Sequence, residues 1–227
     1  MIRPFTLAML VGVALATAQE SPSPTGTTTA TATPSAAPAR SVRISFVPPP
    51  LEGTISLGIY DREGKLVRVL VDQGSVDEFD VGADALNAKW DGKNDRDEDL
   101  PAGKYHARGY MVGALKAEDL GPATTPVPLD LNNRAQVKLV SNPLSKDAKT
   151  IVDLVASFED DQIVLKSADG LPLFTVIEAA GVTRLFAKKS GEKSIDLWAD
   201  NGNLVEQIRV SNVDQMMAFD CGEIELK

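Results

Sequence analysis

The sequence predicts a two-part all-β protein: a β-sandwich followed by a C-terminal antiparallel β meander or small sandwich. Three observations support this fold class. From Ser41 onward, short runs of alternating apolar and polar residues recur about every ten residues. Turn-forming residues, mainly Gly, Asp, Asn and Pro, separate these runs. No stretch after Ser41 shows the longer apolar period that indicates an amphipathic helix.

The first residues have the pattern of a secretory signal peptide. Arg3 precedes the apolar run Leu7–Ala18, in which Ala16 and Ala18 supply the small residues that signal peptidase requires. The run is shorter than the roughly 20 residues that cross a bilayer, so we favour cleavage over a membrane anchor. No cysteine lies near this site for lipid attachment, and no later segment is apolar enough to span a membrane. We therefore expect residues 1–18 to be removed from an exported protein that is periplasmic, surface-bound or secreted.

The charge and the cysteine content exclude several classes of partner. The 227-residue chain has a formal charge of −9, and removal of residues 1–18 takes away one arginine, which leaves −10. Because an acidic chain repels phosphate backbones and anionic lipid, we expect no nucleic-acid or membrane-surface partner. Cys221 is the only cysteine, so no intramolecular disulfide can form. We expect a buried structural thiol, with an intermolecular bridge as the alternative.

Composition divides the rest of the chain. Residues 19–40 are almost wholly Ser, Thr, Pro, Ala and Gly, and we expect a disordered linker that is extended rather than coiled. Residues 41–120 form the first predicted β domain. Residues 121–150 form a linker with one possible strand at Gln136–Val140, and residues 151–227 form the C-terminal β domain.

The alternating runs place the strands. VRISF, TISLGIYD and KLVRVLVD are predicted strands, and Asp61–Gly64 joins the last two as a hairpin loop with Gly64 where φ must be positive. Gly103–Gly113 is a further strand. In the C-terminal third, the turns SADG, KSGE and ADNG separate more strands. The hairpins that contain Gly170 and Gly202 share an outline, which indicates either an internal repeat or the chance recurrence expected in a meander; we favour the meander.

Residues 42–115 resemble the FlgD-type immunoglobulin-like module, named for the flagellar hook-capping protein. LGIYDREGKLVRVL matches the family's Ile-Tyr-Asp strand end, Gly turn and Val-Arg-x-Leu strand. WDGKNDRDEDLPAGKYHARGY matches its Trp-Asp-Gly turn, polar loop and Pro-Ala-Gly-x-Tyr entry into the last strand. The resemblance implies an immunoglobulin-like sandwich with these structural motif residues: Tyr60, Asp61, Gly64, Trp90, Asp91, Gly92, Pro101, Gly103 and Tyr105.

Two departures limit what the resemblance implies. The family's polar loop usually has Gly before its last apolar residue, whereas this chain has Asp97–Asp99. The hook-capping protein is exported without a cleaved signal, whereas this chain begins with one and has no recognisable hook-binding region. The resemblance therefore implies the module and not the hook-capping role. In other exported bacterial proteins such modules are structural or binding units.

The acidic loop within WDGKNDRDEDLPAGKY raises the question of a metal site. Counted from Asp95, Asp97 and Asp99 occupy positions 3 and 5 of an EF-hand-type calcium loop. However, position 6 is Leu100 instead of Gly, and position 12 is His106 instead of a bidentate Glu. We therefore predict a solvated turn without metal. The alternative is a weak calcium site that uses these carboxylates: Asp91, Asp95, Asp97 and Asp99.

The sequence offers little catalytic chemistry. His106, the only histidine, lies in a predicted strand on the same face as Arg108, and no nucleophile motif, phosphate-binding loop or dinucleotide fingerprint is present. A thiol dyad of His106 with Cys221 has no local support. Residues 159–161 (Glu-Asp-Asp) could supply paired carboxylates, but we favour a solvated loop. We predict that the protein is not an enzyme, uses no cofactor and has no small-molecule substrate.

Together these observations predict an exported, non-enzymatic structural or binding protein of the cell envelope. It would bind a protein partner or a second copy through surface complementarity or strand addition at a sheet edge. One alternative is an accessory component of a flagellar or secretion assembly. The other is a carbohydrate-binding protein, but the aromatic content of only 5% leaves few side chains on which a sugar could stack. Trp90 and Trp198 lie in strand patterns that indicate the core.

Overall fold

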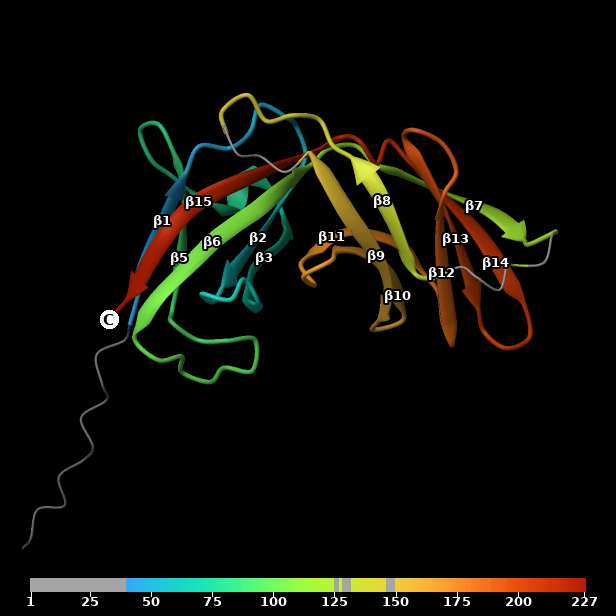
Figure 1. The fold of residues 1–227 in the computed structure, drawn as a ribbon, viewed down its shortest axis with the longest axis horizontal. Coiled ribbons are helices and arrows are strands. Elements are labelled where there is room, and N and C mark those ends of the chain that lie inside the picture. The colour runs from blue at the N-terminus through green and yellow to red at the C-terminus, as the bar shows by residue number, and fades with distance from the viewer. Residues whose placement is uncertain (1–39, 125–126, 128–131, 146–149) are drawn as a thin grey trace, which may run out of the picture. The chain divides into compact units, whose positions relative to one another are not determined.

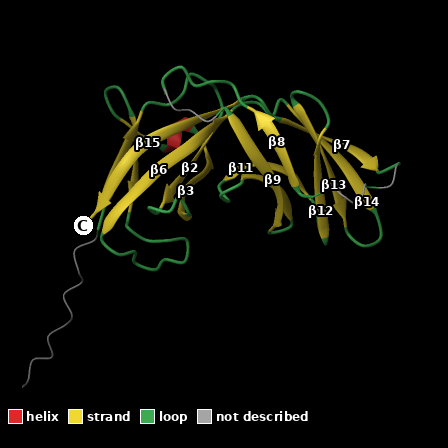
Figure 2. Ribbon diagram, viewed as in Figure 1, coloured by secondary structure: helices red, strands yellow, loops and turns green. Residues whose placement is uncertain are grey.

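The computed structural model describes residues 40–124, 127, 132–145 and 150–227. The prediction of an all-β fold is confirmed for this part of the chain, in which one 3₁₀ turn, η1 (Val76–Glu78), is the only helical element (Figure 1, Figure 2). The strands are β1 (Val42–Phe46), β2 (Thr54–Tyr60), β3 (Leu66–Gly74), β4 (Asp80–Val81), β5 (Leu86–Trp90), β6 (Gly103–Val112), β7 (Lys116–Pro122), β8 (Arg134–Lys138), β9 (Ile151–Glu159), β10 (Gln162–Ser167), β11 (Pro172–Glu178), β12 (Arg184–Lys189), β13 (Ser194–Asp200), β14 (Val205–Ser211) and β15 (Met216–Leu226).

Two sheets form the predicted sandwich. The first has the order β1-β5-β4 and the second has the order β15-β6-β2-β3, and all neighbouring strands are antiparallel. Alternation along β2 directs Ile55, Leu57 and Ile59 between the sheets, where each is fully buried. Trp90 is also fully buried and meets the Tyr105 ring edge to face, with ring centroids 5.0 Å apart. These two motif residues therefore anchor one end of the core.

The predicted hairpin turns are present. Gly64, Gly170 and Gly202 have φ values of 81°, 96° and 87°, a region that L-residues with a side chain rarely adopt. In the first turn, a carboxylate oxygen of Asp61 accepts hydrogen bonds from the backbone N–H groups of Glu63 and Lys65, both at 2.9 Å. The strand predicted at Gln136–Val140 is β8, which begins two residues earlier than expected.

The remaining two sheets surround a second core. They have the orders β11-β10-β9-β8 and β12-β13-β14-β7. β7 was not predicted as a strand, because its sequence KAEDLGP is charged and ends in Gly and Pro. It pairs with β14 at the edge of its sheet, where exposed charges are tolerated. The core residues come mainly from β8 to β14 and include Leu154, Ile163, Leu173, Ile195, Leu197 and Val210.

β6 and β15 contribute to both cores. They pair along their full lengths, so Met216 lies opposite Val112 and Met217 lies opposite Met111. Met216 and Val112 belong to the second core, whereas Met217, which is also buried, and Met111 lie on the opposite face of the sheet. Tyr110 likewise packs into the second core. Residues 109–112 of β6 and residues 216–219 of β15, which pair with each other, are therefore buried on both faces, which is unusual for an antiparallel pair.

The pairing of β15 was not predicted from the sequence. The last strand of the chain pairs with β6, a strand of the first sandwich, and ends with Leu226 in the same hydrophobic cluster as Trp90. Hydrogen-bonded strand pairs far apart in sequence leave no local signal, so the alternation pattern could not reveal this pairing. The division of the chain into domains itself stays a prediction.

Trp198 is buried, as its strand pattern indicated, but it lies outside the hydrophobic cluster of the second core. Along β13, Ile195, Leu197 and Ala199 face that core, so Asp196, Trp198 and Asp200 lie on the other face of the sheet. Trp198 is nevertheless only 8% exposed. It sits between Phe186 on β12 and Gln207 on β14 in the strand register.

Asp196 on this outer face is held by charged hydrogen bonds. Burial opposes its ionisation, but Arg209 donates two hydrogen bonds to its carboxylate, at 2.7 and 2.9 Å, and the net effect is a lowered pKa. A carboxylate with a lowered pKa in the folded state stabilises the protein above its unfolded-state pKa. That stabilisation is lost as the pH falls through the lowered folded-state value.

We expect the shared strands to couple the two cores into one cooperative unit. In a Trp198→Phe background, the fluorescence of Trp90 reports on the first sandwich alone. Met216→Ala truncates a side chain that faces only the second core, and should lower the free energy of unfolding by about 2–4 kcal/mol. In urea, the Trp90 signal should shift to lower denaturant by the same amount as the far-ultraviolet circular dichroism. A Trp90 transition that Met216→Ala leaves in place would contradict the coupling.

We also expect Asp196→Asn to reduce the acid sensitivity of the fold. The substitution removes a group whose stabilising contribution begins to decrease near pH 4, where aspartates normally titrate, and is lost as the pH falls through its lowered folded-state pKa. The variant should melt at a lower temperature than the wild type at pH 7. The difference should shrink as the pH approaches 3, as measured by differential scanning calorimetry. An equal difference at both pH values would show that Asp196 acts through packing and not through its charge.

Candidate functional site

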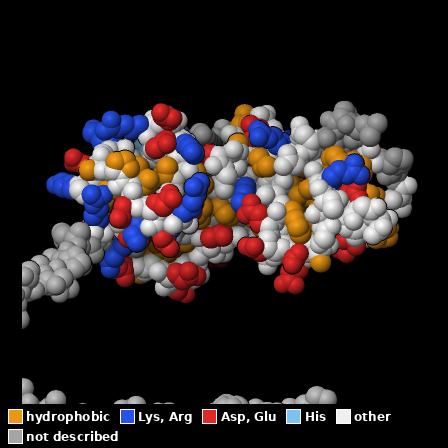
Figure 3. Space-filling model, turned by 90° about the horizontal axis from the view of Figure 1, so that it is seen from below, with side chains coloured by type: hydrophobic (Ala, Val, Ile, Leu, Met, Phe, Trp, Pro, Cys, Tyr) orange, Lys and Arg blue, Asp and Glu red, His pale blue; other side chains and the backbone are white. Residues whose placement is uncertain are grey.

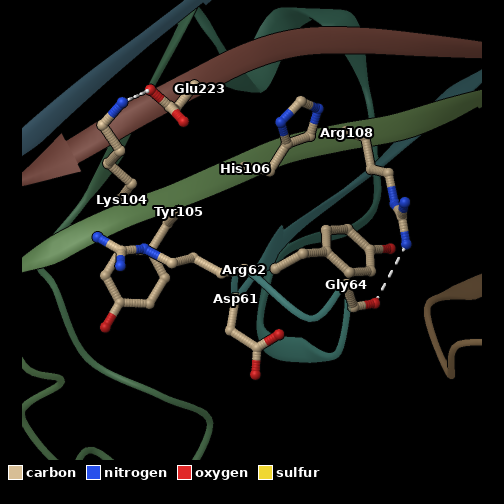
Figure 4. Close-up of a pocket in the computed structure, with 9 residues that line it drawn as sticks. Asp61, Arg62, Gly64, Lys104, Tyr105, His106, Arg108 and Glu223 are labelled. Carbon is tan, nitrogen blue, oxygen red and sulfur yellow. Dashed lines mark hydrogen bonds and ion pairs between the residues drawn. The ribbon is translucent and has the colours of Figure 1, made fainter.

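A shallow hollow of about 340 Å³ lies over the outer face of β6. Lys104, His106 and Arg108 alternate along this strand and point into the hollow, and the turn between β2 and β3 borders it through Arg62 (Figure 4). Glu223 of β15 lies at its other side. The hollow therefore collects side chains of both charges on a strand whose far end is buried on both faces.

Two ion pairs and one histidine–carboxylate hydrogen bond cross the hollow and its margins. The ammonium group of Lys104 lies 2.6 Å from the carboxylate of Glu223. His106 Nε2 lies 2.7 Å from the Asp220 carboxylate, and the Arg108 guanidinium lies 2.7 Å from that of Asp169. The side chains of the first two pairs are largely exposed, whereas those of Arg108 and Asp169 are 29% and 22% exposed. Arg108 and Asp169 therefore form the pair with the greatest protection from solvent.

Arg108 connects an aromatic ring with a carboxylate. Its guanidinium stacks on the ring of Tyr60, 3.8 Å from the ring centroid, while it also pairs with Asp169. Burial and the nearby Asp169 carboxylate raise the pKa of the Tyr60 phenol. The same two causes raise the pKa of Tyr110 to about 12. Both phenols therefore stay protonated at neutral pH and can act only as hydrogen-bonding groups.

A second hollow of about 490 Å³ lies on the other side of Arg108 and Asp169. Tyr110 of β6 and Ile151–Asp153 at the start of β9 line it. The Arg108–Asp169 pair thus separates two hollows along one strand.

Surface charges of both signs are interspersed on the face of the molecule seen from below (Figure 3). Because both hollows are lined by side chains of both charges, they suit a ligand surface that offers hydrogen-bond donors and acceptors better than a surface that is purely anionic.

The acidic loop forms a turn that covers the edge of β3. The N–H of Asp95 donates to the carbonyl of Val67 at 3.3 Å, and the carboxylate of Asp95 accepts from the N–H of Val69 at 2.8 Å. Arg68 between them donates to the carbonyl of Asn94 at 2.7 Å. The loop thereby satisfies backbone groups that an edge strand would otherwise leave open.

The other acids of this loop do not converge on one point. Asp91 accepts a hydrogen bond from the N–H of Lys93, as predicted for a turn, and Asp97 lies 3.9 Å from Arg68. Asp99 forms a backbone bridge opposite Lys93. Across the described residues, no three His, Cys, Asp or Glu side chains group as metal ligands. The hydrogen bonds of Asp91 and Asp95 thus have a structural explanation that requires no calcium.

The other candidate catalytic residues lie in structural contacts. Burial, and then the neighbouring Asp220 carboxylate, raise the pKa of the half-buried Cys221 thiol to about 12, so it is not a thiolate at neutral pH. The hydrogen bonds of His106 Nε2 are to the carboxylate of Asp220 and not to the thiol of Cys221. Glu159 accepts hydrogen bonds from Lys166, both at 2.6 Å. Asp161 lies in the turn between β9 and β10, and its carbonyl accepts a hydrogen bond from the N–H of Ala179.

Comparisons with known proteins identified no relative of this chain. No protein-family model, no curated protein and no solved structure matches the chain. The resemblance to the FlgD-type module therefore stays a prediction. No helix in the described ranges is long and apolar enough to cross a membrane.

Sequence reasoning found part of this site. It placed His106 and Arg108 on one face of a strand, and it identified the residues of the β2–β3 turn. It did not find Asp169, because that residue belongs to a turn 61 positions away from Arg108. The aspartate of the turn SADG could be recognised as a turn former, but its ion pair depends on tertiary packing.

We expect Asp95→Ala to destabilise the fold by about 1 kcal/mol, because the N–H of Val69 loses its hydrogen-bond partner at a solvent-exposed edge. Asp99→Ala is the matched control, since Asp99 is exposed and its side chain forms no recorded hydrogen bond. Thermal melting with calcium and with a chelator checks both variants. A wild-type melting temperature that rises with calcium, and a rise that Asp99→Ala abolishes, would instead support the calcium site.

Proposed function

We propose that the chain is an exported, non-enzymatic structural or binding protein that carries a FlgD-type immunoglobulin-like module and holds a protein partner. The proposal rests on the row of ion pairs along β6. Lys104, His106 and Arg108 stand on one strand and face acids from β15 and from the β10–β11 turn. Basic side chains that are each held by a carboxylate from a neighbouring element present a fixed pattern of charge to a partner.

Rigidity is the property that makes this row suitable for binding. A partner that contacts side chains on a pre-organised strand loses less conformational entropy on binding than it would on a mobile loop. Exposed charges at the rim of an interface mainly steer association and select the partner. The half-buried Arg108, stacked on Tyr60, is the residue of this row with the features of an interface anchor.

We expect site-specific crosslinking to locate the partner at the hollow. Arg62, which is exposed at its border, is replaced by a photoreactive phenylalanine analogue in the full-length protein, expressed in its native host. Lys188, exposed on β12, is replaced in the same way as a matched control. Crosslinks to one protein species from position 62 but not from position 188 support the proposal.

Light scattering on the purified full-length protein separates the two kinds of partner. Concentration-dependent dimer mass together with a crosslinked homodimer from position 62 identifies a second copy. A constant monomer mass with a crosslink of different mass identifies a foreign protein. A monomer that gives no crosslink, or the same crosslinks from positions 62 and 188, would refute binding at this hollow.

A further inference from the structure

The flank of the first sandwich is open between β3 and β5. A hollow of about 410 Å³ lies there, lined by residues from both sheets. Its apolar part comes from Leu70 and Val71 of β3, Ala88 of β5 and Phe79. All four also pack against the core of the sandwich, so the hollow leads to that core.

The opening exists because β4 is short. β4 has two residues, and they pair with Asn87 and Leu86 of β5. The preceding residues, Val76–Glu78, form the 3₁₀ turn η1 instead of continuing the strand. Among the described residues, no strand pairs with Lys89 of β5 on this side.

The backbone of Lys89 faces the opening. The carbonyl of Ala85 accepts a hydrogen bond from the N–H of Gly82, which follows β4, so the backbone groups of Ala85 point towards the β4 side. In an antiparallel sheet, backbone groups alternate in direction along a strand, so those of Asn87 and Lys89 point the same way. The N–H and C=O of Lys89 are therefore directed into the flank, beyond the end of β4.

The rim of the opening is acidic. Asp72, Glu78 and Asp80 contribute carboxylates, whereas Lys89 contributes the single positive charge among the lining residues. Lys89 lies 3.0 Å from Asp80, and both side chains are about two-thirds exposed, which makes this ion pair weak and easily exchanged. The net charge of the lining favours an occupant with positive side chains.

We propose that this flank accepts an extended segment of a partner protein in which apolar residues alternate with lysine or arginine. The segment adds a short strand beside β5 and pairs with the backbone of Lys89. Its apolar side chains cover Leu70, Val71 and Ala88, while its basic side chains meet the acidic rim. This inference rests on the proposed function, because it identifies the chemistry of the partner, but it concerns a different surface from the hollow on β6.

A short, capped peptide of alternating valine and lysine is the probe for this site. Its binding to the full-length protein is measured by fluorescence anisotropy. A peptide of alternating valine and glutamate tests the charge preference, and the lysine peptide with a central proline tests the need for an extended strand. We expect binding of the lysine peptide only; equal binding of all three peptides, or no binding, would overturn the proposal.

Lys89→Pro tests the backbone contact. Proline removes the N–H that points into the flank, and the edge position tolerates it because that N–H does not face β1. Lys89→Ala is the matched control, because it keeps the N–H and removes the side-chain charge. We expect Lys89→Pro to bind the lysine peptide about tenfold more weakly than Lys89→Ala does. Equal affinities would overturn strand addition.

A third variant keeps the test decisive if Lys89→Pro fails to fold, as judged by the fluorescence of Trp90. Asp72→Lys reverses one charge of the rim at an exposed position, and should weaken the lysine peptide by about threefold. An unchanged affinity would overturn the role of the acidic rim. Crosslinks from position 62 in a protein that binds no peptide would refute the flank site alone. If the protein gives no crosslinks from position 62 and also binds no peptide, the proposed function is refuted as well.

Discussion

The burial of the paired ends of β6 and β15, residues 109–112 and 216–219, on both faces is the constraint on which the rest of the structure depends. One face of this strand pair supplies Met111 and Met217 to the sandwich, and the other supplies Val112 and Met216 to the second core. Neither core is complete without these strands, since truncation of a side chain on either face leaves an unfilled space in a close-packed interior. The outer halves of the same strands carry Lys104, Glu223 and their neighbours, so the charged row continues from the strand ends that both cores hold in place.

The edges of the sheets are protected by side chains that take the place of a neighbouring strand. The carboxylate of Asp95 accepts from β3 as a carbonyl would. The amide of Gln73 does the same for β11: its Oε1 accepts from the N–H of Thr175 at 2.7 Å, and its Nε2 donates to the hydroxyl of Thr175 at 3.1 Å. Edge strands with unpaired backbone groups invite association with other chains. The flank beside Lys89 is notable in this setting, because no comparable side chain covers it in the described structure.

Local sequence was sufficient for features that depend on local physics. The turns at Gly64, Gly170 and Gly202 were predicted because their backbone conformation excludes most other residues, and Trp90 was predicted as a core anchor. The burial of Trp198 was also predicted, but a period of two does not say which face of β13 meets the second core, so the sequence did not show that Trp198 lies on the face opposite to that core. Strand β7 was missed because edge strands accept charged residues. The contact of Arg108 with Asp169 was beyond reach, because it joins elements that only the tertiary fold brings together.

The acidic residues of the chain are distributed differently over the two proposed binding surfaces. Along β6, Glu223 and Asp169 pair with Lys104 and Arg108, so most of the charge there is compensated within the row, and the proposed partner would be selected by the pattern of donors and acceptors. At the flank, three carboxylates face one lysine, so the charge is unbalanced and selects by sign. If both proposals hold, the two surfaces would contact different parts of one partner, and linked contacts of this kind raise the overall affinity without a stronger individual site. Because β2 and β6 connect the two surfaces within one sheet, their spacing is set by the fold and not by a flexible linker.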